Sequence, residues 1–214
     1  MRKTFLLLVL AALVGASAAF AVGEPQKKIT PADQARAKAM LMRQADVGIG
    51  YRPIAGNSSG NALSFNCPAL DESDLTVSGE ASSPNFSSGL QTFSSASAVY
   101  VSASDAKASW RRGTSPAGFT CLRAVFKRIA RARGLHFVSF RKIPFPAVAP
   151  RTAAYRWQSL ANGVRVYADV VLLMRVRAQS AVFLISGIDP LERPEAVRLT
   201  RLISSRMAKA MRNA

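Results

Sequence analysis

Histidine is almost absent from this 214-residue chain, and carboxylates are scarce. The one histidine is His136, and 12 Asp and Glu stand against 29 Lys and Arg, which gives a net charge of +17. A Ser-His-Asp site needs a histidine oriented by a carboxylate, yet Asp169 is the only acid between residues 106 and 188. Metal centres need several closely spaced His, Cys, Asp or Glu side chains. The sequence has no such set, so we predict no metal and no cofactor.

Two serine-containing segments match the sequence of catalytic motifs, but neither has the flanking structure or the companion motifs that those motifs require. Gly56–Gly60 fits G-x-S-x-G, but a nucleophile elbow lies between a strand and a helix, and both flanks here have loop composition. Ser104–Lys107 fits S-x-x-K, but the companion S-D-N and K-T-G motifs are missing. We therefore interpret Ser104 as a helix N-cap and His136 as structural. The prediction is that the protein is not an enzyme, with an enzyme of unrecognised type as the alternative.

Long hydrophobic runs occur only at the N-terminus. Arg2 and Lys3 precede the apolar run Phe5–Val14, and Ala19-Phe20-Ala21 fits a cleavage site, so residues 1–21 are expected to be a secretory signal peptide. An uncleaved anchor is the alternative, although the run is shorter than the roughly 20 residues of a membrane span. We therefore expect a secreted or extracytoplasmic protein associated with the cell envelope.

Cysteine is equally rare, with only Cys67 and Cys121. Their spacing excludes a CxxC redox pair, and a metal site lacks neighbouring His or Cys ligands. In an oxidising compartment an even number of cysteines favours a structural disulfide. We predict the bond Cys67–Cys121, which closes a loop of about 54 residues.

Apolar periodicity and turn residues predict an α+β fold. Thr30 and Pro31 begin a helix over 31–46, after a flexible lead-in at 22–29, and a Gly/Ser-rich loop follows to residue 66. Asn162-Gly163 is typical of a two-residue hairpin turn. Further helices are expected from Ser104 to Gly113, from Ser115 to Gly134, and after Pro194; strands are expected at 75–81, 93–102, 135–143, 152–160, 164–174 and 178–186. Residues 67–214 should form one domain, a twisted antiparallel sheet of about five or six strands packed with two or three helices, with the 31–46 helix on it.

Positive charge is the strongest functional signal. Between residues 106 and 188 there are 15 Lys or Arg against Asp169 alone. The helix from Ser115 has an apolar stripe through Cys121 and Ile129, and basic residues lie off that stripe. We predict contact with anionic envelope polymers or lipid headgroups, weakened by salt, through Arg111, Arg112, Arg123, Lys127, Arg128 and Arg131. Nucleic acid is the weaker partner because the aromatic residues do not share one face, and a merely solvated basic surface explains the charge as well.

Asp169 lies within an apolar strand sequence, which leaves two interpretations. On a buried face it would need an arginine partner such as Arg156 or Arg165. On an open face it would need none. We expect the open face.

The order of elements resembles a group of exported actinobacterial domains. The resemblance rests on Ala45–Tyr51 after the first helix, on Ala98–Ser102 ending a strand, and on Asp105-Ala106, Trp110 and Cys121 in a helical region. Extracellular sensor domains of membrane serine/threonine kinases and related lipoproteins are similar in this order, and their fold is distantly similar to the PsbP-like sandwich. The resemblance implies a non-enzymatic ligand-binding or sensing module with a disulfide. The chain lacks a kinase domain and a lipid-accepting cysteine, and the resemblance transfers no catalytic residue.

Overall fold

The structure is a computed structural model that describes residues 23–54 and 67–212. No helix in these ranges is both long and apolar enough to cross a membrane. In chain order the elements are β1 (Gln26–Lys27), α2 (Pro31–Ala39), α3 (Gln44–Val47), β2 (Arg52–Ile54), the 3-10 helix η2 (Pro68–Leu70), β3 (Thr76–Ser82), β4 (Asn85–Ser88), β5 (Gln91–Tyr100), α4 (Ala103–Thr114), α5 (Pro116–Ala132), β6 (His136–Lys142), β7 (Arg151–Ala161), β8 (Val164–Arg175), β9 (Ala178–Gly187) and α6 (Arg193–Ala210).

All of these strands join one nine-stranded sheet, whose main order is β1-β3-β5-β9-β8-β7-β6. Neighbouring strands pair antiparallel, except that β1 pairs parallel to β3. β4 pairs with the first residues of β5 and also with β2. The predicted α+β class is confirmed, but the sheet has nine strands where five or six were predicted. The long helices are α2, α4, α5 and α6.

The three missed strands, β1, β2 and β4, are short and polar, so apolar alternation does not reveal them. Residues 26–28 were expected to be a flexible lead-in, which is wrong. The Gln26 amide donates to the Leu75 carbonyl at 2.8 Å, and the Lys28 amide donates to the Val77 carbonyl at 2.9 Å. The expected turn at Asn162-Gly163 is confirmed, since both residues have positive φ, 51° and 81°.

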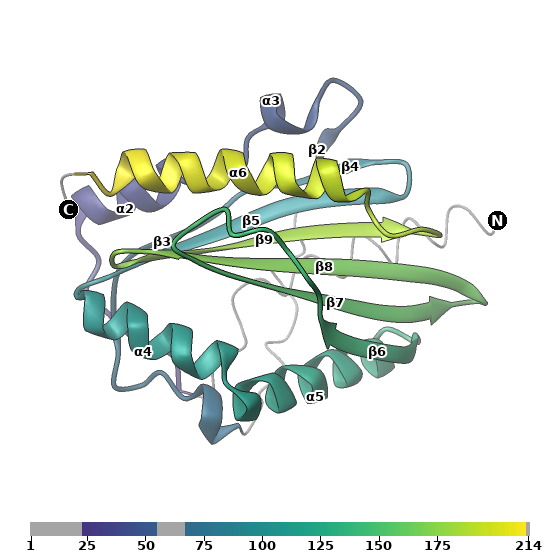
Figure 1. Cartoon of the computed structure of the whole chain (residues 1–214), viewed down its shortest axis with the longest axis horizontal. Helices are drawn as coiled ribbons and strands as arrows, with labels where there is room; N and C mark the ends of the chain where they lie inside the picture. Colours follow the sequence, from purple (N-terminus) through teal and green to yellow (C-terminus); the bar gives the residue numbers. More distant parts are fainter. Residues whose placement is uncertain (1–22, 55–66, 213–214) are drawn as a thin grey trace.

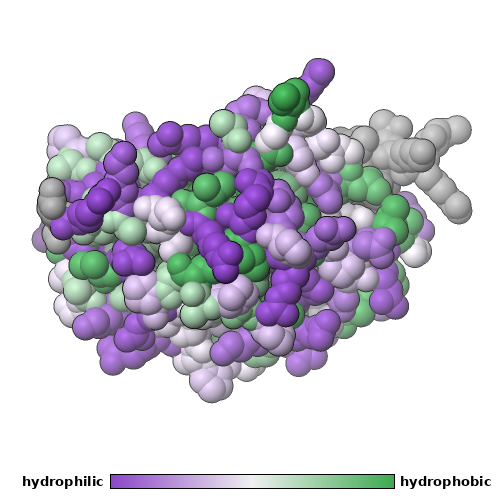
Figure 2. Space-filling model, turned by 45° about the horizontal axis from the view of Figure 1, so that its top comes forward, coloured by the Kyte–Doolittle hydropathy of each residue, from purple (hydrophilic) through white to green (hydrophobic). Residues whose placement is uncertain are grey.

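Helices cover both faces of the sheet (Figure 1). On one face α2 and α6 pack over the buried side chains of β8 and β9, among them Val171, Leu173 and Leu184. On the other face α4 and α5 pack over Tyr155, Trp157 and their neighbours. The outside of the α2–α6 layer is mostly hydrophilic, with a hydrophobic patch near its centre (Figure 2).

Because both faces are covered, β8 has no open face, and the expectation for Asp169 is wrong. Asp169 is buried, and its carboxylate accepts two hydrogen bonds of 2.6 Å from Arg156, the residue opposite it on β7. Paired in this way, the carboxylate tolerates burial.

The first helix is interrupted rather than continuous over 31–46. Thr30 caps α2 as predicted, because its hydroxyl accepts from the Asp33 amide. α2 ends at Ala39, and the chain passes through the extended residue Arg43 before α3. The interruption lets Met40 and Met42 both be buried.

The basic helical region divides at a different residue from the one predicted. Gly113 lies inside α4, which runs to Thr114. The break is at Ser115, because Pro116 disfavours a helical conformation in the residue before it, and Ser115 is extended and caps α5. Likewise the N-cap of α4 is Ser102, whose hydroxyl accepts from the Asp105 amide at 3.0 Å, and not Ser104.

The disulfide between Cys67 and Cys121 is confirmed, with 6.1 Å between the two Cα atoms. It joins the start of η2 to α5. η2, which ends at Leu70, is thereby held against the α4–α5 layer, and Glu72 follows it two residues later.

Candidate functional site

A cavity of about 530 Å³ lies between the sheet and the α4–α5 layer. The sheet contributes residues of β3, β5, β9, β8, β7 and β6, and the helices contribute Ser109, Trp110 and Leu122 among others. Its lining is largely apolar and includes the aromatic residues Tyr100, Trp110, Phe126, Phe140, Tyr155 and Phe183. Cavities of this size and character are typical of small-molecule sites.

Local sequence features set the width of this cavity. The sheet wall is lined by small side chains at Ala96, Ala98 and Ala181, which lie on adjacent strands β5 and β9. Larger residues there would fill the space between the layers. On the helix side, Gly113 also lines the cavity, and a Cβ atom added to it would meet nothing within 4 Å. Small residues on both walls therefore keep the volume open.

The rim of the cavity is acidic in an otherwise basic protein. Glu24, Glu72 and Glu80 line it, together with Lys27 as the only basic residue in the lining. Lys27 is already engaged, since its Nζ lies 2.7 Å from Glu80 and 3.9 Å from Glu24. Of the three rim carboxylates, Glu72 is the one without an ion pair in the described part of the chain.

Glu72 belongs to a small polar cluster on the cavity wall. The Tyr100 hydroxyl lies 3.4 Å from Glu72 Oε2 and 2.8 Å from Ser109 Oγ. Burial raises the pKa of Glu72, although hydrogen bonds from Ser109 and Tyr100 oppose the rise. Burial, with the nearby Glu72 charge, also raises the pKa of the Tyr100 phenol. The cluster therefore places a poorly solvated carboxyl group and two neutral hydroxyls beside apolar space.

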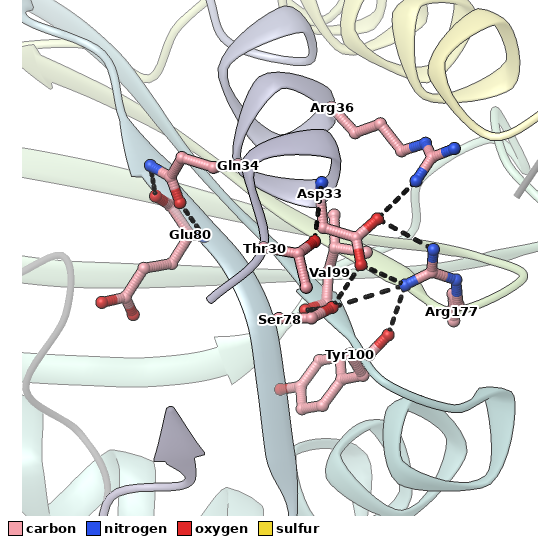
Figure 3. A network of polar contacts seen from close by, with 9 residues as sticks. All are labelled: Thr30, Asp33, Gln34, Arg36, Ser78, Glu80, Val99, Tyr100 and Arg177. Carbon is pink, nitrogen blue, oxygen red and sulfur yellow. Dashed lines mark hydrogen bonds and ion pairs between the residues drawn. The ribbon is translucent and has the colours of Figure 1, made fainter. Parts of the chain in front are cut away.

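Unlike Glu72, the buried aspartates elsewhere in the described chain are each paired with an arginine. Asp33 accepts two hydrogen bonds of 2.8 Å from Arg177 and one of 2.6 Å from Ser78, and Figure 3 shows the Arg177 guanidinium lying between Asp33 and the Tyr100 carbonyl. Asp46 and Asp169 are likewise held by two nitrogens of one arginine, which is Arg206 for Asp46 and Arg156 for Asp169.

These pairings affect the pKa of two of the carboxyls. Hydrogen bonds from Arg177 hold the pKa of Asp33 far below its usual range. Burial acts to raise the pKa of Asp46, but Arg206 and the Arg43 amide lower it overall. These arginine pairs join elements distant in sequence, and they serve the fold.

The predicted basic contact residues are spread over two helices. On α5, Arg123, Lys127, Arg128 and Arg131 are exposed, and Arg111 is exposed on α4. Arg112 instead forms an ion pair with Asp74, since its two terminal nitrogens lie 2.6 and 2.7 Å from the Asp74 carboxylate. The outer side of α5 is therefore the main basic surface among those predicted.

The rejected catalytic candidates lie apart from the cavity. His136 is exposed at the start of the edge strand β6, and Ser104 is exposed on α4 with its hydroxyl 2.7 Å from that of Ser102. Gly56–Gly60 lies outside the described residues. Within residues 23–54 and 67–212 no group of three His, Cys, Asp or Glu is placed to hold a metal ion.

Sequence reasoning missed the cavity and Glu72. The residues around it come from β1, η2 and the segment after it, six further strands of the sheet and two helices, so no local motif marks them. One signal was available: Glu72 lies in a short acidic stretch before β3, in a chain with few acids. Protein-family models and curated proteins were searched with this sequence, and neither search found a match.

Proposed function

We propose that this protein is a non-catalytic binding module of the cell envelope, and that it holds a small, largely apolar ligand between its sheet and the α4–α5 layer. The observation that carries the proposal is the 530 Å³ cavity lined by apolar and aromatic side chains. Burial of apolar ligand surface contributes roughly 25 cal/mol per Å², which supplies the main driving force. The expected signal peptide and the resemblance to exported sensor-like domains support the location and the class.

A cavity-filling variant tests this proposal. Ala181 lines the cavity from β9, so phenylalanine at this position would occupy ligand space. We expect A181F to weaken the binding of the neutral fluorescent probe N-phenyl-1-naphthylamine at least about tenfold, which corresponds to about 1.4 kcal/mol. The measurement is a fluorescence titration of the purified protein.

The matched control is A35F, because Ala35 is exposed on α2, on the opposite side of the sheet. It should bind the probe like the unchanged protein. Probe binding that is absent from the unchanged protein, or equal in A181F and A35F, would contradict the proposal.

The exposed basic side of α5 supports a second activity, attachment to anionic surfaces of the envelope. α5 contains four Lys or Arg and no acid, so its outer side attracts anionic lipid headgroups and polymers. This surface and the cavity belong to the same layer, so attachment would bring the cavity close to the envelope.

Charge removal tests this attachment. We expect R123Q/K127Q/R131Q to lower binding to vesicles of phosphatidylglycerol and phosphatidylcholine by about tenfold, since each basic residue near an anionic surface contributes about 1 kcal/mol at most. Added salt should weaken binding of the unchanged protein. Cosedimentation measures both effects.

The control R201Q/K209Q/R212Q removes three exposed charges from α6 and its C-terminal end, on the opposite layer. It carries the same net charge as the α5 variant. If the two variants lose binding equally, overall charge and not the α5 surface is responsible.

A further inference from the structure

In the described chain each buried aspartate is paired with an arginine, whereas Glu72 is not. Asp33, Asp46 and Asp169 each bind two nitrogens of one arginine. The hydrogen-bond donors at the Glu72 carboxylate are the hydroxyls of Tyr100 and Ser109. The nearby Arg112 is directed to Asp74 and to the Asp71 carbonyl instead. The sequence has 29 Lys and Arg, yet among the described carboxylates that line the cavity Glu72 is the one that forms no ion pair.

An unpaired carboxylate beside apolar space costs free energy unless something binds it. Burial raises the pKa of Glu72 accordingly. A positively charged group in the cavity would supply the missing partner and would form a charge-assisted hydrogen bond with it. Tyr100 and Trp110 line the same cavity, and aromatic faces also attract ammonium groups.

We infer that the ligand is a cationic amphiphile, with an amine or ammonium head held by Glu72 beside Tyr100 and Trp110 and an apolar body extending between the sheet and α5. This inference rests on the proposed function, because it assigns the polar end of the same cavity. The aromatic side chains of Phe126, Phe140 and Phe183, which also line the cavity, contact the apolar body.

The net charge of the whole protein makes this inference sharply testable. A chain with net charge +17 attracts anionic amphiphiles and repels cationic ones through its long-range field. A preference for cations therefore has to arise locally, at the cavity. Non-specific adsorption would give the opposite order of affinities.

The experiment is displacement of bound N-phenyl-1-naphthylamine by three amphiphiles with the same dodecyl chain, each below its micelle concentration. They are dodecylammonium, whose head donates N–H hydrogen bonds, dodecyl maltoside and dodecanoate. At neutral pH and physiological ionic strength, we expect the ammonium compound to displace the probe at a concentration at least about tenfold lower than the other two, as a hydrogen-bonded or paired charge commonly gives. This order is measured on the unchanged protein and needs no variant.

Replacing Glu72 shows where the preference arises. E72Q should remove the tenfold advantage of the ammonium compound over dodecyl maltoside. E80Q is the matched control, because it removes the same charge from the same rim at a carboxylate that Lys27 already neutralises, and it should keep the advantage. E72Q should unfold at no lower temperature than the unchanged protein, since burial disfavours the charged form of Glu72.

The outcomes separate the two proposals. Equal displacement by all three amphiphiles, or a preference for dodecanoate, overturns the cationic ligand and leaves the apolar cavity standing. A cationic preference that survives in E72Q also overturns the role of Glu72. Failure of the probe to bind at all overturns the proposed function itself.

Discussion

Replacing Asp33 with alanine is expected to lower the free energy of unfolding by about 3–5 kcal/mol, the usual cost of breaking a buried ion pair. The side chains of Asp33 and Arg177 are only 8% and 17% exposed. D33A leaves the Arg177 guanidinium without its carboxylate and removes the nearer of two acceptors of the Ser78 hydroxyl, the other being the Val99 carbonyl. Denaturant unfolding monitored by circular dichroism measures the loss.

The matched control for D33A is D74A, which breaks a pair of the same type, with Arg112, at a carboxylate that is 63% exposed. Exposed pairs contribute at most about 1 kcal/mol, so D74A should change stability little. Equal losses in the two variants would show that burial of the Asp33 pair is not what stabilises the fold.

The pH dependence of stability gives a second measure of the same pair. The pKa of Asp33 is lower in the folded protein than in the unfolded chain, so its contribution is present above the unfolded value, near 4. It is lost as the pH falls from there through the folded-state pKa. D33N should therefore show a smaller loss of stability than the unchanged protein over this acidic range.

Removing the disulfide is expected to cost about 4 kcal/mol, because it closes a loop of 54 residues in the unfolded chain. That is comparable to the whole net stability of many domains. The bond also holds η2, which ends two residues before Glu72, against α5, so the variant C67A/C121A should bind N-phenyl-1-naphthylamine more weakly. Unfolding and probe titration are measured on the same preparations.

Reductant provides the control for the disulfide. Dithiothreitol should lower the stability of the unchanged protein towards that of C67A/C121A, and it should have no effect on the variant. A reductant effect of the same size in both proteins would show that the bond is not responsible.

Local signals predicted the parts of the fold that depend on a few adjacent residues. Thr30 caps its helix and Asn162-Gly163 makes its turn because each conformation follows from the residues themselves. The disulfide was predictable because only one pairing exists. Ser104 was mistaken for the cap because Ser102, two residues earlier, offers the same hydroxyl, and only the backbone geometry distinguishes them.

Features set by distant partners were not predictable in the same way. Asp169 was misplaced because its environment depends on how many layers cover the sheet. β1 is a strand only because β3 offers it a free edge. Glu72 becomes part of a site only through its contacts with Tyr100 and Ser109, and the residues adjacent to Glu72 in sequence do not indicate a cavity beside them.

The ion pairs of the first two helices can form only late in synthesis of the chain. Asp33 and its partner Arg177 are 144 positions apart, and Asp46 and Arg206 are 160 positions apart. Synthesis proceeds from the N-terminus, so these two aspartates lack their arginines until nearly the whole chain has been made. Contacts between such distant positions also form slowly. The first two helices therefore cannot complete their buried ion pairs until α6 has been synthesised.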